Sequence, residues 1–246
     1  MQEFHLGPQP NEKPSKADIN IIEKLLGPKA AAKYKGTGEE DESRKDLGYT
    51  PSVEDFSDVE ALRKEQKEKE VKEKQEQEKN IAESKRQMLV WAKKSEVDES
   101  YIAENVIYEP NGDVIWEGDC NFLWKKNMTS FPPNLKEVRG KLYISGTGIE
   151  SLVGCPSSVT ILDCSGTKIK NLAGCPSSVT DLDCSLTKIE SLAGCPSSVT
   201  KLYCLVCEKL TEISVGLHTD LVIHLSESQE ELAAEAKAKG YTVVLK

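Results

Sequence analysis

Hydrophobic positions in the C-terminal half of the chain recur with a period of twenty residues. Cysteine stands at 155, 175 and 195 and again at 164, 184 and 204, isoleucine at 149, 169 and 189, and leucine at 152, 172 and 192. Near the middle of each unit apolar and polar residues alternate, which predicts a short β-strand with one buried face. A unit of this length cannot bury its own apolar side. We therefore expect the units to stack, with their strands forming one parallel sheet over a continuous core.

Each unit follows the pattern V-x-x-L-x-C-x-x-T-x-I-x-x-L. The clearest copy has Val159, Leu162, Cys164, Thr167, Ile169 and Leu172, and the next has Val179, Leu182, Cys184, Thr187, Ile189 and Leu192. This pattern resembles the leucine-rich repeat, L-x-x-L-x-L-x-x-N-x-L-x-x-L, position for position. A degenerate copy lies at 141–152, an earlier cap-like copy runs from Cys120 to Phe131, and a later copy begins at Val199 and drifts after Cys204. Threonine replaces the family's asparagine, which implies a less rigid turn after each strand.

Elements of other kinds flank the repeats. Two β-prone runs, Val106–Tyr108 and Val114–Trp116, enclose Pro110-Asn111-Gly112, which predicts a β-hairpin. After the repeats we expect a strand, a helix ending at Gly240, and a last strand over Tyr241–Leu245 that together cover the open sheet edge. The predicted fold class is α/β. The resemblance implies a short leucine-rich-repeat solenoid over 98–246, with a β-hairpin N-cap (105–117), repeats (118–225) and a βαβ C-cap (226–246), preceded by an extended arm and a long charged helix.

A long charged helix is predicted over 57–95. Ser57 and Glu60 form a capping box at its start, and no glycine or proline follows as far as Lys94. Its middle is nearly devoid of apolar residues, which favours a solvated spacer over a coiled coil, although packing against a partner is the alternative. The last turns carry Met88, Leu89, Trp91 and Ala92, which we expect to dock the helix onto the next domain.

Residues 1–56 are rich in proline, glycine, lysine and glutamate and predict an extended or disordered arm. One short helix, 16–26, interrupts the arm before Gly27-Pro28. Its apolar stripe is the candidate anchor and consists of Ile21, Ile22, Leu25 and Leu26.

Composition limits the partners and the compartment. The net charge is -9, and the lysine-rich helix is balanced by glutamate, so we expect no nucleic-acid partner. No apolar run approaches the ~20 residues of a membrane span, and the N-terminus has no apolar signal core. We expect no membrane partner and a cytoplasmic or virion-associated protein with mostly reduced thiols.

The regular cysteines admit several interpretations. Cys164, Cys184 and Cys204 occupy a core position and are expected to pack as small hydrophobes. Cys155, Cys175 and Cys195 form either a second inward ladder or a set of oxidation-prone surface thiols. Cys204 and Cys207, with His218 and His224 nearby, leave a zinc or thiol site as an alternative. We expect no cofactor and no metal.

The sequence contains no G-x-S-x-G, no P-loop, no H-E-x-x-H and no paired carboxylates on a cleft-forming scaffold, and we expect no enzyme. The resemblance implies that outward strand positions form a binding face, with an acidic centre between Lys-Tyr pairs. These positions are Lys141, Tyr143, Ile161, Asp163, Asp181, Asp183, Lys201, Tyr203 and His224.

The repeats resemble most the degenerate repeats of tailed-phage and bacterial proteins. This implies a non-enzymatic interaction module whose arm anchors in a larger assembly, such as a phage virion with its capsid or tail proteins, and whose repeat domain is displayed or clamps a neighbour. A bacterial effector that binds host proteins is the alternative of the same class. A thiol or zinc protein is the alternative of another class.

Overall fold

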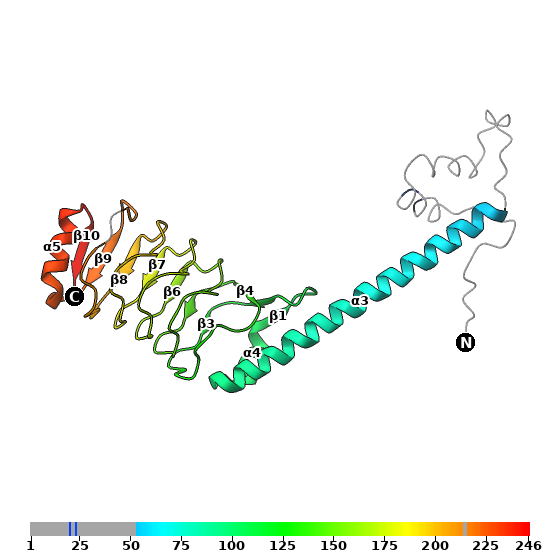
Figure 1. Cartoon of the computed structure of the whole chain (residues 1–246), viewed down its shortest axis with the longest axis horizontal. Coiled ribbons are helices and arrows are strands. Elements are labelled where there is room, and N and C mark those ends of the chain that lie inside the picture. The colour runs from blue at the N-terminus through cyan, green and yellow to red at the C-terminus, as the bar shows by residue number, and fades with distance from the viewer. Residues whose placement is uncertain (1–19, 21–22, 24–52, 214–215) are drawn as a thin grey trace, which may run out of the picture. The chain divides into compact units, whose positions relative to one another are not determined.

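The computed structural model describes residues 20, 23, 53–213 and 216–246 (Figure 1). The chain divides into two units, Met1–Glu76 and Gln77–Lys246. Apart from the helical residues Asn20 and Glu23, the described part of the first unit is the beginning of helix α3 (Val53–Ser95). The anchor residues Ile21, Ile22, Leu25 and Leu26 lie outside the described residues.

Helix α3 begins four residues earlier than its sequence predicts. It starts at Val53, so Ser57 lies inside the helix and the predicted capping box at Ser57 is wrong. The physical reason is that Val53–Phe56 contains no glycine or proline, so these four residues can adopt the helical conformation and extend the helix on the N-terminal side of Ser57. Beyond Arg63 its charged side chains are exposed or half-buried as far as Lys79.

The last three turns of α3 belong to the second unit and pack against its core. The buried side chains recur at helical spacing, which places them on one face, and they are Ser84, Met88, Trp91, Ala92 and Ser95. Leu89, predicted to dock with them, is 43% exposed, because it directly follows Met88 and therefore lies about 100° around the helix from that residue. The Trp91 indole Nε1 donates a hydrogen bond to the carbonyl oxygen of Ser130 at 3.0 Å.

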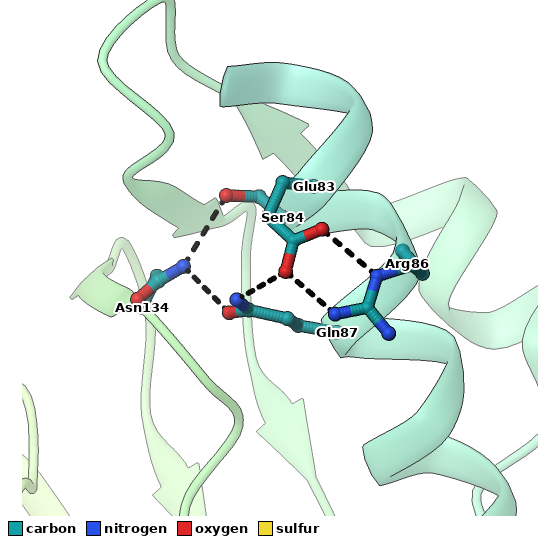
Figure 2. A network of polar contacts seen from close by, with 5 residues as sticks. All are labelled: Glu83, Ser84, Arg86, Gln87 and Asn134. Atoms are coloured by element: carbon teal, nitrogen blue, oxygen red, sulfur yellow. Dashed lines mark hydrogen bonds and ion pairs between the residues drawn. The ribbon is translucent and has the colours of Figure 1, made fainter. Parts of the chain in front are cut away.

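Polar side chains secure the same face of α3 (Figure 2). Ser84 Oγ donates to the Gly112 carbonyl oxygen at 2.5 Å. Asn134 Nδ2 donates to both Ser84 Oγ and Gln87 Oε1, each at 3.2 Å. The buried serine hydroxyl is therefore satisfied both as donor and as acceptor, as burial of a polar group requires.

A small sheet follows α3. The helix α4 (Glu99–Asn105) leads into β1 (Val106–Tyr108), which pairs antiparallel with β2 (Val114–Trp116). The hairpin predicted around Asn111-Gly112 is therefore present. β2 also pairs in parallel with β4 (Leu135–Val138), a strand that the repeat pattern did not predict.

The repeats form a β-solenoid whose strands build a seven-stranded parallel sheet in the order β10-β9-β8-β7-β6-β5-β3. Figure 1 shows these strands following one another from β3, in green, to β10, in red. Their bounds are β3 (Cys120–Asn121), β5 (Leu142–Tyr143), β6 (Ile161–Asp163), β7 (Asp181–Asp183), β8 (Lys201–Tyr203), β9 (Val222–Leu225) and β10 (Thr242–Leu245). The stacking expected from the twenty-residue period is confirmed.

The solenoid core consists of ladders of equivalent side chains. In the sheet, Cys120, Leu142, Leu162, Leu182, Leu202 and Ile223 stand in register. All six are at most 1% exposed, and Cys164, Cys184 and Cys204 beside them are fully buried. Each buried leucine contributes about 1.5–3 kcal/mol, so the ladder contributes substantially to the stability of the stack.

Hydroxyl groups complete each turn of the solenoid. Thr147, Thr167 and Thr187, in the position of the expected asparagine, each donate a hydrogen bond to the carbonyl oxygen three residues earlier, at 2.5–2.7 Å. Ser178 Oγ and Ser198 Oγ donate to the carbonyl oxygens of Val159 and Val179 in the preceding turn, at 2.6 and 2.7 Å. The serines of the repeated Gly-Cys-Pro-Ser-Ser phrase thus join successive turns.

The C-terminal end adds a βαβ unit. The short 3-10 helix η2 (Glu227–Gln229) and helix α5 (Glu230–Ala238) connect β9 to β10, and these two strands are parallel. Gly240, with a φ of +90°, ends the helix as predicted. β10 pairs along the edge of β9 and is the terminal strand of the described sheet, so the unit extends the sheet by one strand.

Candidate interaction face

The outward positions of the solenoid sheet form one surface, here called the interaction face. It comprises the nine predicted residues Lys141, Tyr143, Ile161, Asp163, Asp181, Asp183, Lys201, Tyr203 and His224. Eight of them lie in β5 to β9, and Lys141 directly precedes β5. Each is exposed or half-buried, whereas the leucines between them are buried. The alternation of the strands therefore places all nine side chains on the solvent side.

Two carboxylates occupy the centre of the interaction face. Asp163 and Asp183 are in-register partners on β6 and β7. Asp163 Oδ1 accepts hydrogen bonds from the backbone N–H and the hydroxyl of Ser165, at 3.0 and 2.6 Å. Asp183 Oδ1 accepts one from the Ser185 N–H at 2.9 Å. The serines fix one oxygen of each carboxylate, so both side chains have a defined orientation.

The local environment shifts the pKa of Asp183. Burial raises the pKa of this carboxyl, the neighbouring Asp163 adds to the rise, and the hydrogen bonds from Ser185 oppose it. A carboxylate that is partly desolvated beside a like charge gains most from an approaching cation. Asp181, two residues before Asp183 on the same strand, already has a cationic partner, because Lys201 Nζ lies 3.3 Å from its Oδ1.

An aromatic stack lies on the C-terminal side of the carboxylates. The rings of Tyr203 and His224 are parallel within 9°, with centroids 4.2 Å apart. Lys246 Nζ lies 5.1 Å from the centre of the Tyr203 ring, a cation–π distance. Burial and the charges of Lys246 and Lys201 lower the pKa of His224. Its Nδ1 atom is buried and makes no hydrogen bond.

All eight cysteines are free thiols. Cys155, Cys175 and Cys195 are half-buried and pack against the core. Burial raises the pKa of all three thiols, to about 12 for Cys175 and Cys195. This favours the inward ladder over reactive surface thiols.

Three further thiols meet inside the last turns. Cys184 Sγ and Cys204 Sγ are 3.4 Å apart, and Cys207 Sγ donates to the Cys184 carbonyl oxygen at 3.2 Å. Thiol hydrogen bonds from Cys184 and Cys204 lower the pKa of Cys207. Cys207 is only 1% exposed, and across the described ranges no group of three or more His, Cys, Asp or Glu side chains is placed to hold a metal ion.

We expect Cys175 and Cys195 to resist alkylation in the folded protein. A rise of the pKa from 9.0 to about 12 lowers the thiolate fraction about a thousandfold at neutral pH. Iodoacetamide labelling followed by peptide mass spectrometry measures each site, and the urea-unfolded chain is the control. Labelling of either site at the unfolded rate would contradict the inward ladder.

The same shifts affect stability in alkali. Because the folded pKa lies above the unfolded one, the stabilisation is complete below pH 9 and is lost as the pH rises toward about 12. A Cys175→Ala/Cys195→Ala variant should therefore lose less of its unfolding free energy over this range than the wild type does.

The sequence pattern predicts which strand residues point outward, but it did not identify the side chains that orient the carboxylates and the aromatic stack. Ser165 and Ser185 occupy the same place in successive repeats, and this regularity was an available signal. Lys246 is far from Tyr203 in sequence, and only the parallel pairing of β9 and β10 brings it near.

Comparison with known proteins gives no relative. No family model matches the chain, and neither a curated protein nor a solved structure matches it. Over the described ranges no helix is long and apolar enough to cross a membrane. The fold by itself shows a mixed α/β chain that is built around a β-solenoid of stacked parallel strands.

Proposed function

We propose that this chain is a non-enzymatic protein-interaction module and that the interaction face holds its protein partner. The observation that carries the proposal is the pair Asp163 and Asp183, which stand side by side between Tyr143 and Tyr203. Like charges on directly neighbouring strand positions are unfavourable for the sheet. A basic side chain of a partner relieves that repulsion and packs against the flanking tyrosine rings.

We also propose that the solenoid is a leucine-rich-repeat domain. The support is the registered ladder from Leu142 to Leu202 and the recurrence of the pattern that ends in Leu172 and Leu192. The departure is threonine in the asparagine position. Its hydroxyl donates to the carbonyl oxygen three residues earlier in its own turn, and the hydroxyl of Thr187 also lies 3.7 Å from Cys207 Sγ of the next turn.

The arm supplies the second half of the proposal. The stripe Ile21, Ile22, Leu25 and Leu26 anchors the chain in a larger assembly, and a tailed-phage virion is the assembly that we propose. The charged helix α3 then carries the solenoid, which is displayed or clamps a neighbouring protein. The support is the contrast between an apolar stripe in a polar arm and a charged spacer.

Site-specific photocross-linking in the full chain tests both halves. A photoreactive residue replaces Ile161, in the interaction face, or Leu26, in the anchor, and the chain is returned to its native particle or lysate. We expect position 161 to cross-link to basic segments of one partner protein and position 26 to a protein of the assembly. Mass spectrometry maps the linked peptides.

Two controls make the result specific. The same photoreactive residue at Val153, which is 72% exposed on another part of the solenoid, should not reach that partner. Asp163→Asn/Asp183→Asn should weaken the cross-link from position 161 by about tenfold, as expected when one charge-assisted contact of about 1.4 kcal/mol is lost. If positions 153 and 161 gave the same adducts, the interaction face would have no binding role.

A further inference from the structure

Five equivalent residues, each three positions after the end of a sheet strand, share a left-handed backbone. They stand four positions beyond the registered residues Cys120, Leu142, Leu162, Leu182 and Leu202, and they are Trp124, Gly146, Gly166, Leu186 and Val206. Their φ angles lie between +56° and +69°. The N–H groups of the first four donate to the next turn at 2.8 Å, which confirms their equivalence. We call Trp124, Leu186 and Val206 the apolar turn edge.

The backbone favours glycine at these positions. A left-handed φ is unfavourable for every residue with a Cβ atom and most of all for a β-branched one such as Val206. Gly146 and Gly166 show that the solenoid accepts glycine at the same place. Leu186 and Val206 therefore introduce backbone strain that two other turns of the same solenoid avoid.

Burial does not compensate for this strain. Trp124 is 68% exposed, Leu186 60% and Val206 47%, whereas the leucines of the neighbouring strands are buried. An exposed apolar side chain gains little from the hydrophobic effect in the isolated chain. Three such side chains along one edge are typical of a surface that is covered by a partner.

The two glycines create a notch within this edge. A side chain on Gly146 would collide with the Trp124 indole, so the indole rests directly on that glycine. A Cβ on Gly166 would meet nothing closer than 3.7 Å. Two sheet spacings of about 4.8 Å each separate Gly146 from Leu186. One apolar side chain of a partner therefore fits over Gly166, with contacts of about 3.5 Å to the Trp124 indole on one side and to Leu186 on the other.

Lysines line the outer side of the turn edge. Lys126, Lys168 and Lys188 stand two residues after Trp124, Gly166 and Leu186, and all three are exposed. Lys168 Nζ lies 4.0 Å from Glu150, at the limit of an ion pair. Glu208, at the equivalent place after Val206, is also exposed. The charge next to Gly166 is thus mainly positive, opposite in sign to the centre of the interaction face.

We propose that the apolar turn edge is a second docking surface, which binds an acidic segment of a partner protein by inserting one aromatic or aliphatic side chain into the notch at Gly166. Carboxylates of the segment then face Lys126, Lys168 and Lys188. This surface differs from the interaction face in charge and in the residues that form it. The solenoid therefore has two neighbouring binding surfaces for proteins, the interaction face and the apolar turn edge.

Short synthetic peptides test this docking surface on the full chain. One set has a central phenylalanine or leucine flanked by aspartate and glutamate; matched sets carry lysine in place of the acids or serine in place of the apolar residue. We expect the acidic–apolar set alone to bind, with a blue shift of tryptophan emission. The shift reports on Trp124, because Trp91 and Trp116 are buried.

Leu186→Gly/Val206→Gly gives the decisive comparison. We expect it to bind the acidic–apolar peptides about tenfold more weakly and to unfold at a temperature that is not lowered, because glycine relieves the strain. Val153→Ala should bind as the wild type does, and so should Asp163→Asn/Asp183→Asn, which separates this proposal from that of the interaction face. The proposal is overturned if basic and acidic peptides bind equally, if the double glycine variant is strongly destabilised, or if the edge proves to mediate self-association in sedimentation.

Discussion

Replacement of Phe122 by alanine is expected to destabilise the second unit by about 3–5 kcal/mol. The ring is fully buried and forms edge-to-face contacts with Trp91 and Trp116, with centroids 5.4 and 5.1 Å away. Tyr101 lies edge-on at 6.4 Å. Phe122 therefore joins α3, α4 and β2 to the first turn of the solenoid. Its removal leaves a cavity at the point where all these elements meet.

Urea unfolding followed by tryptophan fluorescence measures this loss, and hydrogen exchange locates it. Amides of α3 around Met88 and Trp91 should lose protection first, because their packing partner is gone. Leu123→Ala is the matched control, since Leu123 is the next residue and is already 37% exposed. If Phe122→Ala does not fold, Phe122→Leu gives a milder test, with an expected cost below about 1.5 kcal/mol. Equal costs at positions 122 and 123 would contradict the aromatic junction.

The repeat region shows what periodicity can predict. Leu162 and Leu182 stand twenty positions apart, and parallel strands in register follow directly from that spacing. The period also ordered the interaction face, because alternation within a strand determines which side chains are outward. The first turn of the solenoid has a different length, because Cys120 pairs with Leu142, which is 22 residues later. A strict twenty-residue period therefore does not predict the register of this pair.

Contacts between distant segments were not predictable in this way. β4 joins β2 through a pairing across about twenty residues that no repeat marks. The contact of Ser84 with Asn134 links residues fifty positions apart and depends on how α3 lies against the small sheet (Figure 2). The exposure of Leu89 was not predictable either, because the apolar cluster Met88, Leu89, Trp91 and Ala92 does not by itself determine which of its residues face the core.

The solenoid gives its two proposed surfaces a common origin. A strand alternates in and out, so every turn must present side chains at the outward positions, of which Asp163 and Asp183 are examples. The turn after the strand must bend in the left-handed region, and whatever occupies that place, such as Leu186, points outward. A stack of short units therefore offers two parallel rows of side chains, and the twenty-residue spacing lets each row change its chemistry without altering the core.

The glycines of the repeated Gly-Cys-Pro phrase provide the second large prediction. Gly174→Ala is expected to cost about 3 kcal/mol: ~1 kcal/mol for a left-handed φ of +85°, and about 2 kcal/mol for overpacking. An added Cβ would lie 2.6 Å from the Val153 backbone nitrogen and 2.7 Å from the Leu152 carbonyl carbon. Backbone atoms cannot turn aside as a side chain can, so the spacing of the two turns must increase.

Gly154 occupies the same place one turn earlier and is the matched control. Its φ is +89°, almost the same, but an added Cβ would meet only the Phe131 ring at 3.9 Å. We therefore expect Gly154→Ala to cost only ~1 kcal/mol, the shared cost of the left-handed backbone. Urea unfolding of both variants isolates the contribution of close packing between turns. Equal losses would mean that backbone conformation, rather than contact between successive turns, makes glycine necessary in the repeat.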